Sequence, residues 1–133
     1  MRFVRFILLL IAAAVAIAGT PTETDVEWEP ACGGSNIKVA RVDGQIVSIS
    51  GFAEHFAEGR EWQCHYTNGK IVSALYRHYT VSRKAAGDAG EFTTEQHTDI
   101  LRVFHFPDHQ LKGLDSDLLD DLKTVISKAT GRT

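Results

Sequence analysis

The sequence is poor in the residues that would point to a particular chemistry. Its 133 residues include only two cysteines, three prolines and one methionine. They contain no Gly-x-Ser-x-Gly nucleophile motif, no His-Glu-x-x-His zinc motif, no Cys-x-x-Cys redox pair and no glycine-rich phosphate-binding loop. We therefore predict no catalytic residue and no cofactor, and the sequence favours no reaction class.

The first 18 residues have the three zones of a secretory signal peptide. Arg2 and Arg5 form the positive zone, residues 6–17 are an unbroken apolar run, and Ala16–Ala18 is a small-x-small cleavage site. The run is shorter than the about 20 apolar residues that span a bilayer. We predict a protein that is exported to the periplasm or secreted and that has no membrane attachment once the signal peptide is cleaved.

The remaining chain has the length of one domain. Loss of Arg2 and Arg5 makes it two charges more negative than the formal net charge of −3 for the whole sequence. This acidic balance disfavours nucleic acid as a partner. Residues 19–31 are polar and acidic, which predicts a flexible leader, and residues 32–133 are predicted to form a single α+β domain.

Cys32 and Cys64 are the only cysteines, and the predicted export would bring them into an oxidising compartment. We therefore expect one structural disulfide between them. In the chain-entropy description, closing a loop of this length contributes roughly 3–4 kcal/mol.

Turn residues recur between β-branched runs. Asp43-Gly44 and Asn68-Gly69 predict type I′ turns, which need positive φ at both central residues. Asp108-His109 is a third copy in which histidine takes the glycine position. These signals predict an antiparallel β-meander of five to six strands, from about residue 37 to residue 111.

The last segment predicts one amphipathic helix that covers the sheet. Asp115 or Ser116 can cap its start and Gly131 can end it. One helical face is apolar, formed by Leu118, Leu119, Leu122, Val125, Ile126 and Ala129. We expect this face to pack on a sheet core of Trp62, Tyr66, Ile71, Leu75, Phe104 and Phe106.

A two-residue turn at Asn68-Gly69 sets an expected register for the central hairpin. It pairs Tyr66 with Ile71, Cys64 with Ser73 and Trp62 with Leu75, and it directs these six side chains to the core. The opposite face is then a candidate binding surface. Its expected members are His65, Tyr76 and His78, with Arg77 near the end of the strand. Tyrosine and arginine are enriched in interface hot spots.

Two chemical alternatives stand beside a binding role. His65, His105, Asp108 and His109 would form a transition-metal site if the second and third hairpins were neighbours, although their spacing matches no established ligand motif. A small hydrolase without a recognisable motif is the other alternative. Because neither chemical alternative has stronger support than a binding role, we favour a non-catalytic binding or interaction module whose partner is an envelope or extracellular protein. The sequence predicts no oligomeric state.

Overall fold

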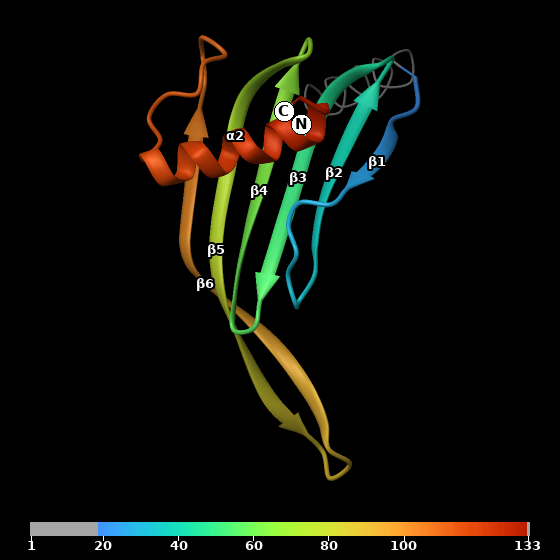
Figure 1. Ribbon diagram of the computed structural model, residues 1–133, viewed down its shortest axis with the longest axis vertical. Coiled ribbons are helices and arrows are strands. Elements are labelled where there is room, and N and C mark those ends of the chain that lie inside the picture. Colours follow the sequence, from blue (N-terminus) through green and yellow to red (C-terminus); the bar gives the residue numbers. More distant parts are fainter. Residues whose placement is uncertain (1–18, 133) are drawn as a thin grey trace, which may run out of the picture.

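The structure is a computed structural model that describes residues 19–132, so the predicted signal peptide lies outside the described residues. Within these residues, one antiparallel sheet of six strands runs in sequence order, and one helix lies across one of its faces (Figure 1). The elements are β1 Thr22–Val26, β2 Ser35–Val42, β3 Gln45–His55, β4 Glu58–Thr67, β5 Lys70–Ala86, β6 Glu91–His105 and α2 Ser116–Thr130. The predicted meander and its covering helix are confirmed.

The two glycine turns have the backbone that their residues predict. Asp43 and Gly44 have φ values of 52° and 80°, and Asn68 and Gly69 have values of 53° and 73°. Positive φ at both central positions is the geometry that twists two adjoining strands into a hairpin. These turns join β2 to β3 and β4 to β5.

The third turn does not form a hairpin, and here the prediction is wrong. His109 has the expected positive φ of 60°, but β6 ends at His105 and the chain continues to α2. The Phe106 amide donates a hydrogen bond to Val72 O at 2.9 Å, and His109 Nδ1 donates one to Ile71 O at 2.9 Å. The turn therefore satisfies carbonyl groups of β5 and does not begin another strand.

A β-bulge changes the register of the central hairpin. Tyr66 pairs with Ile71 as expected, but His65 pairs with Ser73, so Val72 has no opposite residue. The extra residue reverses which face each later side chain occupies. Trp62 consequently opposes Tyr76, and its ring centroid lies 4.8 Å from that of Tyr76.

The core lies between the sheet and α2. The helix contributes Leu122, Val125 and Ala129, and Gly131 ends it with a φ of 70°. The sheet contributes Trp62, Ile71 and Phe104 as predicted, and Phe106 directly follows β6. Tyr66 packs against this core while partly buried, and Tyr76 replaces Leu75. Among residues 19–132 no helix has the length and apolar character needed to cross a bilayer.

The predicted leader is part of the folded domain. Thr22–Val26 forms β1 and pairs along its whole length with β2. Trp28 is only 1% exposed, and it lies in the core cluster. An aromatic ring of this size buries enough apolar surface to order the segment around it.

The expected disulfide is absent, and both cysteines are free. Cys64 is buried opposite Ile49 in the middle of β3, whereas the exposed Cys32 accepts a hydrogen bond from the Phe56 amide at 3.0 Å. Ile49 and Phe56 are seven positions apart, or roughly 23 Å along a strand. Bridged cysteines need Cα atoms within about 7 Å, so the register keeps these two apart.

Candidate interaction surface

The sheet face opposite α2 carries no covering element among the described residues, and we call it the open face (Figure 1). Alternation along each strand assigns side chains to it, because successive residues point to opposite faces. One row crosses four strands in register, from Phe52 on β3 through Glu61 and Arg77 to Leu101 on β6. Phe52 is 40% exposed and Leu101 is 59% exposed, so large apolar side chains flank a central ion pair.

Arg77 is held in place at the centre of this row. Its Nε donates to Glu61 Oε1 at 2.6 Å, and its two terminal nitrogens donate to Thr98 Oγ1 at 3.2 Å and Gln96 Oε1 at 3.0 Å. The guanidinium carbon lies 4.4 Å from the centroid of the Tyr79 ring. A side chain with so many partners loses little conformational freedom when another molecule binds it.

Tyr79 supports Arg77 from within the same face. It opposes Gly59 on β4, which has no side chain, and it is only 2% exposed. Its hydroxyl donates to Glu54 Oε2 at 3.0 Å. Burial, followed by this bond to a carboxylate, raises the pKa of Tyr79 to about 12, so the phenol keeps its proton.

A shallow depression of about 240 Å³ lies beside Phe52 on the open face. Residues that line it include Asn36, Lys38, Ser50, Glu61 and Gln63. These side chains supply both hydrogen-bond donors and acceptors. The depression is small, and its chemistry suits one polar side chain of another molecule.

The structure divides the predicted binding residues between the two faces. His65 and Arg77 lie on the open face, whereas Tyr76 and His78 lie on the helix face because of the bulge at Val72. Tyr76 is 7% exposed. His78 bonds Asp99 through Nδ1 at 2.7 Å, and its Nε2 lies 3.5 Å from Glu58.

The four predicted metal ligands do not converge. His65 and His105 share the open face, but both are in register with Ser73 on the intervening strand, which puts their backbones roughly 10 Å apart. Asp108 follows β6, and the His109 ring is bonded to the Ile71 carbonyl. Within residues 19–132 no three histidine, cysteine, aspartate or glutamate side chains are grouped to hold a metal ion.

The helix face carries an ionic cluster beside the core. Arg60 donates to Glu29 Oε1 at 2.6 Å and makes two bonds to Asp121, and its guanidinium carbon lies 4.2 Å from the centroid of the Trp28 ring. His55 Nε2 lies 3.1 Å from the same Glu29 oxygen. Since these groups are engaged with one another, the cluster joins the N-terminal segment, β4 and α2.

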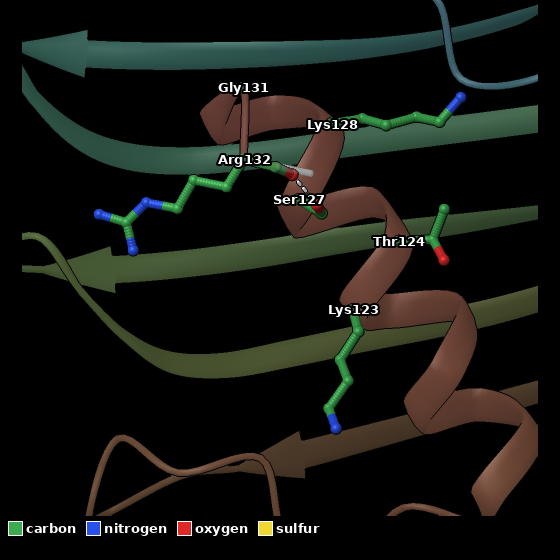
Figure 2. Close-up of a pocket in the computed structure, with 6 residues that line it drawn as sticks. All are labelled: Lys123, Thr124, Ser127, Lys128, Gly131 and Arg132. Atoms are coloured by element: carbon green, nitrogen blue, oxygen red, sulfur yellow. Dashed lines mark hydrogen bonds between the residues drawn. The ribbon is translucent and has the colours of Figure 1, made fainter.

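A second depression lies along α2, with a volume of about 460 Å³ (Figure 2). Lys123, Lys128 and Arg132 line it, but their side chains point in three different directions (Figure 2). The other lining residues are Thr124, Ser127 and Gly131. Because the lining has no carboxylate or imidazole and its cations diverge, it offers neither an acid–base pair nor an anion site.

Phe52, Glu61 and Leu101 were not predicted as surface residues. Phe52 lies in a segment, residues 52–59, whose sequence is compatible with either a short helix or a strand. Leu101 belongs to β6, and its partner Arg77 on β5 lies across a long hairpin. The β-branched and aromatic residues Ile100, Val103 and Phe104 were the available signal for that strand.

Comparison with known proteins gives no relative for this chain: no family model, no curated protein and no solved structure matches it.

Proposed function

We propose that this protein is an exported, non-catalytic interaction module that binds another protein through its open face. The observation that supports the proposal is the row in which exposed Phe52 and Leu101 flank the fixed Arg77–Glu61 pair. Phenylalanine and arginine are both enriched at protein interfaces, and arginine is enriched in their hot spots.

The chemistry of this row specifies the kind of partner. A flat, mixed surface with only a shallow depression suits a folded protein more than a small molecule, which needs a concave pocket. The partner would place apolar side chains over Phe52 and Leu101 and one polar side chain in the depression beside Lys38. The acidic net charge argues against nucleic acid.

Affinity capture from an envelope extract tests the proposal. Phe52→Ser/Leu101→Ser should lose a partner that the wild-type protein retains. Phe56→Asn is the matched control, because Phe56 is 84% exposed but lies in the β3–β4 turn, where asparagine accepts its φ of 45°. Thermal unfolding verifies that both variants are folded.

Two results would overturn the proposal. One is the absence of any specific partner for the wild-type protein. The other is a partner that the folded double variant retains as well as the control does.

A further inference from the structure

β6 is a long sheet edge with large exposed apolar side chains. It is 15 residues long and ends the strand order, and it contains neither proline nor lysine. Of the six large apolar side chains that are exposed in residues 19–132, four belong to this strand: Phe92, Ile100, Leu101 and Val103. Natural edge strands avoid pairing by being short, by carrying charges or proline, by a β-bulge, or by being covered. Of these devices β6 has four charged residues and one bulge, at Asp99.

The other edge strand of the sheet differs in each respect. β1 has five residues, of which Glu23 and Asp25 are acidic, and its apolar residue Val26 packs against the core. The β5–β6 hairpin, in contrast, projects beyond the rest of the sheet (Figure 1). Of the two edge strands, β6 is therefore the one whose edge is more accessible to another strand.

A bulge in β6 determines how this strand can pair with β6 of a second copy of the chain. The register shifts between His78 and Tyr79, which leaves Asp99 without an opposite residue on β5. Leu101 and Val103 consequently share the open face with even-numbered residues before the bulge, such as Gln96. Ile100 and Arg102 share the helix face with odd-numbered residues, namely Glu95 and His97.

We propose that two copies of this chain form a dimer by antiparallel pairing of β6 with β6, about a twofold axis between Thr98 and Asp99. An axis perpendicular to the sheet keeps every side chain on its own face, so opposing residues must come from the same face. The bulge shifts the alternation of faces by one residue at Asp99. In the register centred on the bulge, every opposing pair except Thr98 with Asp99 therefore comes from the same face.

Charge complementarity supports the same register. Arg102 opposes Glu95 of the partner subunit, and symmetry makes this ion pair twice. Within one chain, Arg102 bonds the 70% exposed Asp115 and Glu95 pairs with the 66% exposed Lys84. Exposed pairs of this kind contribute at most about 1 kcal/mol, so either charge can change partner at small cost.

The pairing also protects the edge and extends the open face. The outward backbone groups of β6 gain partners, and Ile100, Leu101 and Val103 gain cross-strand neighbours. Since the axis is perpendicular to the sheet, both open faces lie on the same side of a continuous sheet. Such a dimer displays two copies of the proposed interaction surface and would bind a multivalent partner with avidity.

Charge reversal tests the dimer and its register together. We expect the purified protein to sediment as a dimer that dissociates on dilution. Arg102→Glu or Glu95→Arg alone should weaken the dimer at least about tenfold, since each creates two like-charge contacts. The double reversal Glu95→Arg/Arg102→Glu should restore it. Arg83→Glu, an exposed change on the neighbouring strand β5, is the control that should leave dissociation unchanged.

A disulfide trap gives a second measurement in a Cys32→Ser background. Leu101 opposes Gln96 of the partner subunit in this register, so Gln96→Cys/Leu101→Cys should form a covalent dimer on mild oxidation. Gln96→Cys/Val103→Cys should not. A wild-type monomer at millimolar concentration would overturn the proposal, and so would a double reversal that stays weak or a trap that forms equally with Val103→Cys. None of these results bears on the capture of a partner by the open face.

Discussion

Arg60 on β4 and Asp121 on α2 are joined by two hydrogen bonds, Nε to Oδ2 at 3.0 Å and Nη2 to Oδ1 at 2.9 Å. Trp62 Nε1 donates to the same Oδ2 at 2.8 Å. One carboxylate therefore attaches the helix to the sheet and satisfies the indole of a fully buried ring. The arrangement gives α2 a defined position over the apolar core.

Asp121→Ala should lower the free energy of unfolding by about 2 kcal/mol, because it leaves the Trp62 indole and part of the Arg60 guanidinium without partners. Urea denaturation measures this loss. Asp120→Ala is the matched control: Asp120 is exposed on the same helix, and its replacement should change stability by no more than about 0.5 kcal/mol. Equal effects of the two variants would contradict the role assigned to Asp121.

Glu29 should make stability depend on acid pH. Its hydrogen bond from Arg60 is the largest cause that lowers its pKa below the usual 4.5, against the opposing effect of burial. A carboxyl group with a lowered folded-state pKa stabilises the fold above its unfolded pKa, and this contribution is lost as the pH falls through the folded value.

Glu29→Gln should therefore be less stable at neutral pH and should lose less stability than the wild type below pH 4.5. Urea titrations at a series of pH values measure both quantities. Glu27→Gln, which changes an exposed carboxylate two positions earlier, should follow the wild-type curve. If the free energy of unfolding falls with pH in parallel for Glu29→Gln and the wild type, the Arg60 bond does not contribute to the acid transition.

Gly59→Ala should destabilise the protein by about 2 kcal/mol. A β-carbon at this position would lie 2.5 Å from the Tyr79 hydroxyl oxygen and 2.7 Å from its Cε2, so the ring and its stacked Arg77 would have to move. Thermal or urea unfolding measures the loss.

Gly51→Ala is the control for Gly59→Ala. Its β-carbon would meet Ile37 and Val125 at 3.5 Å, which is ordinary contact, and we expect little loss. Combining Gly59→Ala with Tyr79→Ala should cost less than the sum of the single changes, because the clash disappears with the ring. Strict additivity would contradict this explanation.

The parts of the fold that the sequence predicts are those that local chemistry determines. Asn68-Gly69 and Asp43-Gly44 tolerate the positive φ that a type I′ turn requires, and the helix stripe requires only its own periodicity. The bulge at Val72 is different, because the regular register also gives a plausible core. It depends on the packing of Tyr76 against Trp62 and on bonds from residues 106 and 109, which lie more than 30 positions away along the chain.

The candidate interaction surface is harder to predict for the same reason. The row from Phe52 to Leu101 requires the correct register in three successive strand pairs. The last pair is joined by a hairpin whose residues 83–90 have the composition of a loop, although half of them, residues 83–86, belong to β5. Polar composition did not separate an exposed strand from a loop, because both are in contact with water.

The free cysteines should differ strongly in reactivity. Cys32 is exposed, whereas burial of Cys64 raises the pKa of its thiol to about 12, so Cys64 is both protonated and inaccessible in the fold. A maleimide should label one thiol per chain in the native protein and two after denaturation without reductant. Cys32→Ser should abolish the native labelling, and Cys64→Ser should leave it unchanged. A protein that shows no labelled thiol even when denatured would contain the disulfide that the observed register excludes, and β3 and β4 would then have to be paired differently around Cys64.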